Sequence, residues 1–389
     1  MSRIKIVHVI NWLNYGGAEV MLCNLLDRTD LRRFDPVVVS LIDVLPLAAR
    51  IEARGVPVRV VGMRPGVPDP RGFARMAAIL RAERPDVIQG WMYHANLVAG
   101  LASAATVRAP VAWGIHHTHH DPKAEKRSTL WTVAACARLS RRLPARIVCC
   151  SESARRAHER RGFAAERMTV IPNGIDTEAF RPDPAARAAV RRELGLAPET
   201  PLIGLAARYS PQKDPMNFLR AAALLKDRLP DARFVICGTQ TDPSNLELVG
   251  AVEGLGLRGR CLLLGPRADM PRLMAAFDLL AQSSVTEAFP LTLCEAMACG
   301  VPCAATDVGD SATILGKSGR IVPPRDPKAL ADACADLLGL SSEARALSGA
   351  EGRRSICARF ELGRIVHYYE DMYESLYTAA RSGDRRAAS

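Results

Sequence analysis

Short apolar, β-branched runs alternate along the chain with longer stretches whose apolar residues recur at helical spacing. In the first half, such runs predict buried parallel strands at residues 4–10, 37–41, 58–61, 87–89, 111–115 and 146–150. A second series predicts strands at residues 202–206, 233–237, 261–264, 279–281, 301–305 and 319–322. Amphipathic stretches such as 73–84 and 123–142 predict helices between strands. This alternation predicts two doubly wound, Rossmann-like α/β sheets.

A segment dense in Pro, Gly, Asn and Asp, IPNGIDTEAFRPDPAAR at 171–187, separates the two series and is typical of a linker. The 389 residues also exceed what one ordinary core accommodates. We therefore predict one domain over 1–174, a second over 175–359, a helix over 360–381 and a disordered tail over 382–389. Because open α/β sheets bind ligands beyond the carboxyl ends of their strands, we expect the two domains to face each other across a ligand-binding cleft.

Composition predicts a cytoplasmic protein. The chain is 48% hydrophobic and 24% charged, has no apolar run of the ~18–20 residues that span a bilayer, and opens directly into a strand rather than a signal peptide. None of its eleven cysteines forms a C-x-x-C pair. Several lie in apolar runs, which predicts buried thiols in a reducing compartment rather than disulfides or a zinc site.

The formal charge of +11 has several interpretations. Only seven of the 52 basic residues are lysine, so the arginines could reflect a GC-rich genome and a solvated surface. The functional alternatives are a membrane surface, phosphorylated substrates or nucleic acid. Basic runs such as 138–146 lack the interleaved aromatic residues of a nucleic-acid stacking platform, so no nucleic-acid partner is expected.

Two strand ends in the first half carry candidate ligand-binding residues. Gly16 and Gly17 follow the first strand, where paired glycines let the backbone approach a ligand closely, although a plain tight turn fits as well. The strand at 111–115 is followed by four histidines that are too close in sequence to form one tetrahedral zinc site, namely His116, His117, His119 and His120. We expect His116, or its neighbour His117, to hydrogen-bond a ligand.

In the second half, the strand at 202–206 ends in AARYSPQKDP, which places two cations, Arg208 and Lys213, in one loop. Two fixed cations suit a diphosphate, and a surface charge pair is the alternative.

The stretch TEAFPLTLCEAMACG at 286–300 predicts a helix that begins at Pro290 and ends at Gly300. Glu295 lies inside this helix among apolar residues, where an unpaired carboxylate is costly. The helix start attracts phosphate, whereas Glu295, more than a turn further in, suits a ribose diol. Glu287, ahead of the helix, suits hydroxyls of a sugar. Phosphate flanked by polyols describes a nucleotide-sugar.

Five motifs together, in this order, resemble family 4 glycosyltransferases of the GT-B fold. They are GGAE after the first strand, IPNGID in the linker, RYSPQK, EAFPLTLCE and GRIVPPRDP, and the resemblance spans residues ~4–375. It implies a retaining transferase that moves a hexose or N-acetylhexosamine from a nucleotide-diphosphate sugar, a UDP-sugar in preference to a GDP-sugar, to a lipid-linked or polysaccharide acceptor in cell-surface glycan synthesis. It also implies that the C-terminal helix packs back on the first domain.

The resemblance carries specific roles to specific residues. Arg208 and Lys213 hold the donor diphosphate, Glu295 binds the ribose and Glu287 binds the transferred sugar. His116 contacts the donor sugar near the reacting carbon, with His117 as the alternative. Gly16 and Gly17 belong to a loop that closes on the donor. Backbone N–H groups contribute around Phe289, Pro290, Leu291 and Thr292.

The chain departs from the family pattern at three places, one of which is the absence of a glutamate that is often found a few residues after position 310. Ala288 and Pro290 stand where glycine is common, and Asp310 follows Gly309 where a second glycine is common. No D-x-D motif occurs, so we expect neither a metal nor another cofactor. A nucleotide-sugar epimerase on the same fold and a non-catalytic partner subunit remain as alternatives.

For the acceptor side we expect the 90–96 loop, GWMYHAN, to contribute Trp91, Tyr93 and His94. The expected helix at 123–142 carries basic residues around Leu130, Trp131 and Val133, which suits an anionic leaflet. Packing of its apolar face on its own sheet is the alternative. The protein would then be cytoplasmic, or peripheral on the inner face of the plasma membrane.

Overall fold

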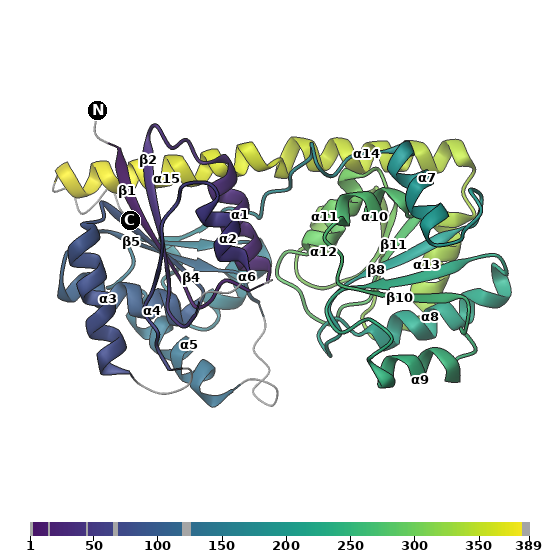
Figure 1. Cartoon of the computed structure of the whole chain (residues 1–389), viewed down its shortest axis with the longest axis horizontal. Coiled ribbons are helices and arrows are strands. Elements are labelled where there is room, and N and C mark those ends of the chain that lie inside the picture. Colours follow the sequence, from purple (N-terminus) through teal and green to yellow (C-terminus); the bar gives the residue numbers. More distant parts are fainter. Residues whose placement is uncertain (1–2, 15, 44–45, 65–68, 119–125, 383–389) are drawn as a thin grey trace. The chain divides into compact units, whose positions relative to one another are not determined.

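The computed structural model describes residues 3–14, 16–43, 46–64, 69–118 and 126–382 (Figure 1). The chain forms two compact units. Unit 1 comprises residues 1–174 and 362–389, and unit 2 comprises residues 175–361. The tail expected to be disordered lies outside the described residues except for Ser382, which ends the last helix.

The sheet of unit 1 has seven parallel strands in the order β3-β2-β1-β4-β5-β6-β7. The strands are β1 Ile4–Ile10, β2 Phe34–Ser40, β3 Val58–Val60, β4 Val87–Trp91, β5 Val111–Ile115, β6 Arg146–Cys149 and β7 Met168–Val170. The central strands β4 and β5 are buried along their whole length, because helices cover both faces of the sheet (Figure 1). This burial accounts for their continuous apolar runs.

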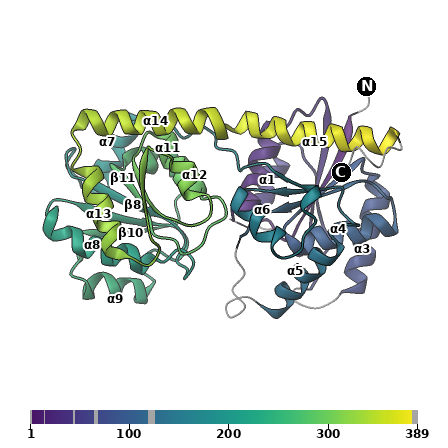
Figure 2. The same cartoon turned by 180° about the vertical axis from the view of Figure 1, so that it is seen from behind.

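The described residues of unit 1 form eight helical segments. They are α1 Gly17–Arg28, α2 Leu47–Glu52, α3 Pro70–Glu83, α4 Tyr93–Ala105, α5 Arg127–Leu139, α6 Glu152–Glu159, the short 3-10 turn Ala165–Arg167 and α15 Leu362–Ser382. Side chains of α1, α2 and α15 form one core cluster with β1 and β2. Figure 2 shows the same units from behind, with α3, α4 and α5 in view.

Unit 2 repeats the architecture with six parallel strands in the order β10-β9-β8-β11-β12-β13. The strands are β8 Leu202–Ala206, β9 Arg233–Cys237, β10 Cys261–Gly265, β11 Leu279–Gln282, β12 Cys303–Thr306 and β13 Gly319–Val322. Its helices are α7 Pro184–Glu193, α8 Pro215–Arg228, α9 Leu246–Gly254, α10 Met270–Ala276, α11 Leu291–Ala298, α12 Ser311–Leu315, α13 Pro327–Leu338 and α14 Ser342–Phe360. Parallel pairing places the loops that follow β8, β11 and β12 at one edge of this sheet.

The helix expected over 360–381 is α15, which begins two residues later than expected, at Leu362, and ends at Ser382. A separate helix, α14, precedes it and ends at Phe360, with Glu361 between the two. The chain changes units at this break, and α15 belongs to unit 1. There Tyr369 stacks on Trp91 of β4 with ring centroids 6.0 Å apart.

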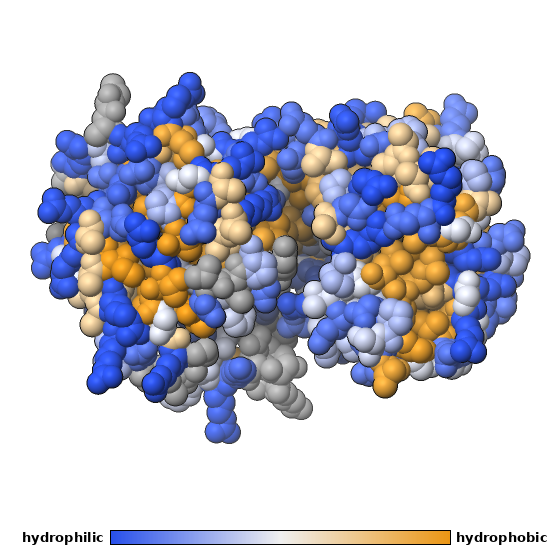
Figure 3. Space-filling view, in the orientation of Figure 1, coloured by the Kyte–Doolittle hydropathy of each residue, from blue (hydrophilic) through white to orange (hydrophobic). Residues whose placement is uncertain are grey.

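All eleven cysteines are free thiols, ten of them buried. Figure 3 shows hydrophilic side chains over most of the viewed face, with smaller apolar areas between them. None of the described helices is long and apolar enough to cross a bilayer.

Candidate active site

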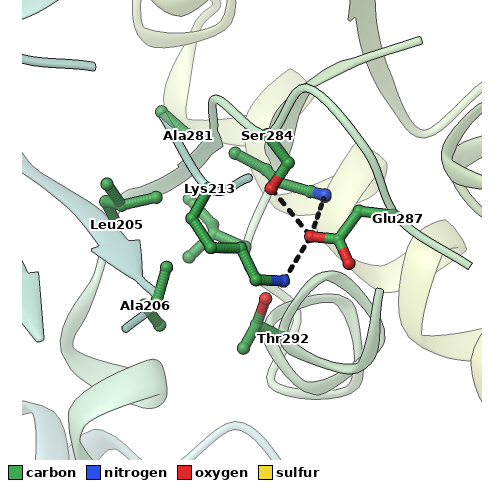
Figure 4. A pocket seen from close by; sticks show the side chains of 10 residues that line it. Leu205, Ala206, Lys213, Ala281, Ser284, Glu287 and Thr292 are labelled. Atoms are coloured by element: carbon green, nitrogen blue, oxygen red, sulfur yellow. Dashed lines mark hydrogen bonds and ion pairs between the residues drawn. The ribbon is translucent and has the colours of Figure 1, made fainter. Parts of the chain in front are cut away.

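Two loops of unit 2 meet at the carboxyl ends of β8 and β11, and an ion pair joins them. The Lys213 ammonium, from the loop after β8, contacts the Glu287 carboxylate, from the loop after β11 (Figure 4). The backbones are tied as well, since the Val285 N–H donates to the Gln212 carbonyl at 2.9 Å and the Ser283 hydroxyl donates to the Lys213 carbonyl at 2.9 Å. The structure therefore brings together two of the residues expected at the site.

Glu287 is held by neutral donors in addition to Lys213. The Ser284 hydroxyl donates to its Oε1 at 2.7 Å, and the Gln282 amide donates to the same oxygen at 3.3 Å. Sequence reasoning gave Lys213 and Glu287 separate ligands and did not include Gln282 or Ser284. The sequence indicated Gln282 and Ser284 only through their position in the run QSS, at the end of a buried strand.

The ion pair lines a small pocket that the start of α11 also reaches. Figure 4 shows the Thr292 side chain beside the Lys213 amine, with Ala206 and Ala281 at the strand ends. Helix α11 begins at Leu291, and its N-cap, Pro290, offers no side-chain acceptor. Among the described residues, no acceptor pairs with the N–H groups of Leu291 and Thr292. Both amides thus remain open to an anion at the positive end of the helix.

Glu295 lies one turn further along α11, and its side chain is half-buried. No hydrogen bond or ion pair reaches its carboxylate from any residue that the structure describes. Burial raises the pKa of Glu295 to about 7, because no partner compensates the lost hydration of the charged form. The unliganded site therefore holds a carboxylate ready to accept two O–H donors.

Arg208 is exposed and stands apart from the ion pair. Its guanidinium donates to the Gln212 side chain at 3.2 Å and has no contact with Glu287. The expectation that Arg208 and Lys213 hold one diphosphate together stays a prediction. Because the Arg208 side chain is long and exposed, it is free to move toward a ligand.

Two glycines that were not assigned to the site from the sequence allow other backbone segments to pack closely against these loops. Gly309 adopts a φ of +60°, and a Cβ there would lie 2.5 Å from the Glu287 carbonyl oxygen. Gly238 adopts a φ of +151°, and a Cβ there would overlap the Ala207 carbonyl, next to Arg208. Close approach of the backbones requires glycine at both positions. The Asp310 N–H also donates to the Ala288 carbonyl at 3.3 Å.

In unit 1, His116 follows β5 and its ring stacks on Trp91, with centroids 5.2 Å apart. Both ring nitrogens are buried, and neither has a hydrogen-bond partner among the residues described. Burial lowers the pKa of His116 to about 4, and the Asn173 side chain raises that pKa by a smaller amount. The imidazole is therefore neutral at pH 7 and keeps one donor and one acceptor for a ligand. His119 and His120 lie outside the described residues.

The expected acceptor-side loop is largely core. Trp91 ends β4 and is 0% exposed, so it does not line a surface. Tyr93 begins α4, is buried, and shares a 2.7 Å hydrogen bond with His158. Both rings are buried in the core of unit 1, so the expectation that Trp91 and Tyr93 line the acceptor side is wrong. His94 is half-buried, and burial lowers its pKa.

The glycine pair after β1 forms the start of a helix. Gly17 is the first residue of α1 and Gly16 is its extended N-cap. A Cβ on Gly16 would overlap the Glu19 carboxylate, which accepts a 3.1 Å hydrogen bond from the Trp12 indole. These atoms are the end of a flexible side chain and Gly16 is extended, so the structure alone does not require glycine at position 16.

The basic helix expected at 123–142 is shorter. Helix α5 spans Arg127–Leu139, so Arg141 and Arg142 follow it in a turn, and Lys123 lies outside the described residues. Val133 is buried and the Cys136 thiol donates to the Tyr93 carbonyl at 3.4 Å, so one face of α5 packs inward. Trp131 is nevertheless 77% exposed.

Comparison with known proteins connects both units to one family. The family model "Glycosyltransferase Family 4" matches residues 15–179, and "Glycosyl transferases group 1" matches residues 200–339. A D-inositol 3-phosphate glycosyltransferase of Corynebacterium urealyticum is 33% identical over 56% of this chain and 53% of its own. The chain thus spans about half the length of this relative. A lipopolysaccharide core biosynthesis mannosyltransferase of Rhizobium meliloti is 28% identical over 89% of this chain and 95% of its own.

Solved structures share the fold across the whole chain. Anabaena HepE in complex with UDP superposes with a TM-score of 0.84 at 24% identity, covering 96% of this chain and 100% of its own. Sucrose-phosphate synthase from Thermosynechococcus elongatus gives 0.81 at 19% identity, covering 97% and 100%. These likenesses confirm the expected GT-B fold. Together with the two family models, they show that the chain belongs to the family 4 glycosyltransferases.

Proposed function

We propose that this protein is a retaining glycosyltransferase that moves a hexose or N-acetylhexosamine from a nucleoside-diphosphate sugar to a lipid-linked or polysaccharide acceptor in cell-surface glycan synthesis. One observation carries the proposal: the Lys213–Glu287 ion pair stands beside the open N-terminus of α11, with the unpartnered Glu295 one turn beyond. A cation and free amides suit a diphosphate, and carboxylates suit polyols.

The ion pair has a specific role in this proposal. When the donor binds, Lys213 exchanges the Glu287 carboxylate for a phosphate oxygen, with the Leu291 and Thr292 amides on the same group. Glu287 then accepts hydrogen bonds from hydroxyls of the sugar, while Ser284 and Gln282 keep it in place. Arg208, which is exposed, moves in as the second cation. The ion pair thus holds both side chains in position before the donor arrives.

The nucleoside end of the donor is assigned to Glu295. Its carboxylate has no partner among the described residues, so it accepts both ribose hydroxyls without giving up a bond to any of them. We favour a UDP-sugar over a GDP-sugar. The Anabaena relative, with UDP-glucose or UDP bound in its solved structures, supports this preference by analogy.

The proposed reaction is a substitution at the anomeric carbon with retained configuration. The bond from that carbon to the phosphate oxygen breaks as the acceptor hydroxyl attacks from the same face, and the acceptor's proton goes to the departing phosphate oxygen. Lys213, Arg208 and the α11 amides stabilise the negative charge that develops on the leaving group. His116, neutral at pH 7, and the Gly16–Gly17 turn are the contributions that the family resemblance assigns to unit 1.

These cations and amides supply the charge stabilisation that a divalent metal provides in other transferases, so we propose that no metal is required. Within the described residues, no three His, Cys, Asp or Glu side chains gather as metal ligands would.

For the acceptor, we propose a lipid-linked or saccharide substrate at the cytoplasmic face of the membrane. The exposed Trp131, with Arg127 and Arg138 on the same helix, suits contact with an anionic leaflet. The lipopolysaccharide mannosyltransferase among the relatives supports an envelope glycan as product by analogy.

Incubation of the full chain with radiolabelled UDP- and GDP-sugars, with and without bacterial lipid extract, tests the proposal. The expected result is label transferred to an acceptor, with the nucleoside diphosphate released, in the presence of EDTA as in its absence. Conversion of the donor to its 2-epimer without transfer would identify an epimerase instead. No turnover of any donor would favour a non-catalytic subunit, and activity restored only by Mn²⁺ or Mg²⁺ would contradict the metal-free assignment.

A further inference from the structure

A second pocket lies in unit 1, at the amino-terminal ends of β5 and β6. It has a volume of about 440 Å³ and is lined by the last turns of α4, by the segment that leads into β5 and by the turn that leads into β6. His116 follows the opposite, carboxyl end of β5, which is five residues long. The pocket is therefore roughly 15 Å from that edge of the sheet. A ligand in it would not touch His116, which follows that edge.

Three arginines line this pocket, Arg108, Arg142 and Arg167, and none of its lining residues is acidic. Arg108 and Arg142 are exposed, and no described residue forms a hydrogen bond or ion pair with either side chain. Arg167 donates to the Pro144 carbonyl. Like charges gathered without a counter-ion repel one another, and an anion with several oxygens relieves that repulsion.

One of these arginines, Arg108, has an uncommon backbone conformation. Arg108 adopts a φ of +55°, a left-handed conformation that residues other than glycine seldom adopt. Its N–H donates to the Ser103 carbonyl at 2.8 Å, and the Ser103 hydroxyl donates to the Ala109 carbonyl at 2.8 Å. The turn is thus fixed on both sides.

Apart from Ser103, the other residues that line the pocket are apolar, and one buried polar atom lies behind them. Pro110, Leu143 and Gly100 line the pocket. The indole N–H of Trp113 is fully buried without a hydrogen-bond partner, and it lies 3.3 Å from where a Cβ on Gly100 would stand. The volume falls within the ~300–1,000 Å³ of small-molecule sites. The pocket is therefore larger than a bare ion needs.

We propose that this pocket is a second anion site, which binds a phosphate monoester whose organic part rests on the apolar wall. Arg108, Arg142 and Arg167 bind the phosphate oxygens, because guanidinium groups match that geometry with two parallel N–H donors each. The phosphate belongs either to a soluble sugar phosphate or to a lipid headgroup. The site is independent of the donor site in unit 2.

The test is titration calorimetry on the full chain with three probes: inorganic phosphate, glucose 6-phosphate and the monomeric short-chain lipid dihexanoyl phosphatidic acid. UDP is present at saturation so that the donor site is filled, and the titrations are repeated with Lys213→Ala. The pocket variant is Arg108→Ala/Arg142→Ala. The matched control is Arg258→Ala/Arg320→Ala, which removes the same charge from two exposed positions of unit 2 outside the pocket. Because neither the Arg108 nor the Arg142 side chain forms a hydrogen bond or ion pair with a described residue, the pocket variant should retain its fold, as a thermal melt verifies.

The expected result is saturable binding of at least one probe at one site per chain, weakened at least tenfold in the pocket variant and within about twofold of wild type in the control and in Lys213→Ala. Tighter binding of the lipid than of glucose 6-phosphate identifies a headgroup, and the reverse order identifies a soluble ligand. Absence of saturable binding under saturating UDP would overturn the proposal, as would equal losses in the pocket and control variants. Loss of binding in Lys213→Ala alone would reassign the anion to the donor site.

Discussion

The Lys213 ammonium and the Glu287 carboxylate, 74 residues apart in sequence, form an ion pair at the edge of the unit 2 sheet. Their side chains are 25% and 10% exposed, so the pair is only partly screened by water. A partly buried ion pair whose carboxylate accepts further hydrogen bonds has a defined geometry. A ligand that binds one of the two charged groups leaves the other without its counter-ion, so the ligand must bind that second group as well. The donor proposed here does so, because it offers phosphate to the lysine and hydroxyls to the glutamate.

Replacement of Lys213 by alanine should reduce kcat/KM for donor turnover by about 10- to 150-fold, the effect of losing one charge-assisted hydrogen bond worth ~1.5–3 kcal/mol. The fold should persist, since Lys213 is at the sheet edge rather than in the core. Lys328→Ala, which removes an 81% exposed lysine from α13, is the control and should leave activity unchanged. Steady-state kinetics with both variants measures the effect. A Lys213→Ala enzyme within about twofold of wild type would refute the phosphate assignment.

Binding of UDP-glucose should depend on the ionisation of Glu295. Only the carboxylate accepts two ribose hydroxyls, and the pKa of Glu295 is about 7 in the unliganded protein. Affinity should therefore be full above pH 8 and fall by up to about tenfold per pH unit below 7. Calorimetric titration from pH 5.5 to about 8.5 measures this slope, with UDP-glucose chosen because its diphosphate does not titrate in the range. Glu295→Gln should bind more weakly at high pH and show no slope; an unchanged slope would exclude Glu295 as the ribose ligand.

The same raised pKa has a consequence for stability. Between the ordinary value of 4.5 and about 7, the native carboxyl holds a proton that the unfolded chain releases. The unfolded state thus binds fewer protons there, and the Glu295 contribution to the free energy of unfolding falls as pH rises through this range. Urea unfolding of the unliganded protein should show Glu295→Gln gaining stability over wild type at pH 8 and not at pH 4.

Gly309→Ala should impair the donor site more than it impairs the fold. A Cβ at position 309 would lie 2.5 Å from the Glu287 carbonyl oxygen, so the loop that carries Glu287 must shift. Gly259→Ala is the matched control, because Gly259 has a similar φ of +71° but open space around its Cβ position. Both variants should lose about 1 kcal/mol of stability from the left-handed backbone. Only Gly309→Ala should also lose donor affinity, by at least about tenfold; equal affinities in the two variants would show that the Glu287 loop does not position the ligand.

Apolar runs predicted the bounds of several strands but not of all. Strand β13 has its predicted bounds although it is only partly buried, and β4 extends two residues beyond its prediction although it is buried throughout. Strands β1, β5, β8 and β9 have the predicted bounds, because apolar runs buried on both faces leave no ambiguity. Strand β7, Met168–Val170, was missed, since its three residues are only half-buried. Strand β12 begins two residues later than predicted, at Cys303, because Pro302 has no N–H to donate to the ladder.

The sequence predicted which residues belong to the candidate site. It did not predict which of their side chains contact each other. Pro290 and Gly300 set the bounds of a helix that contains Glu295, and the structure places α11 between them. The pairing of Lys213 with Glu287 depends on which strands neighbour β8, and no local pattern contains that information. Burial of Trp91 and Tyr93 was missed for the same reason, because β4 continues through Trp91 into the middle of the sheet.

Membrane contact through α5 should appear in liposome flotation at low salt. Vesicles that contain phosphatidylglycerol should carry the protein, and pure phosphatidylcholine vesicles should not. Removal of one arginine near an anionic surface weakens attraction by about fivefold, and loss of an inserted aromatic residue adds to it. Trp131→Ser/Arg138→Ser should therefore abolish flotation, whereas Arg258→Ser, which removes an 85% exposed arginine from unit 2, should not. A protein that stays with the soluble fraction under all conditions would point to a soluble acceptor.

The most direct test of the account is a crystal structure of the protein with UDP-glucose, in which the separation of Lys213 Nζ and Glu287 Oε1 is measured. The account predicts that the ion pair opens: Lys213 contacts a phosphate oxygen beside the Leu291 and Thr292 amides, Glu287 accepts from hydroxyls of the glucose, and Glu295 accepts from both ribose hydroxyls. A complex in which the Lys213–Glu287 pair remains closed and the nucleotide lies away from α11 would contradict it.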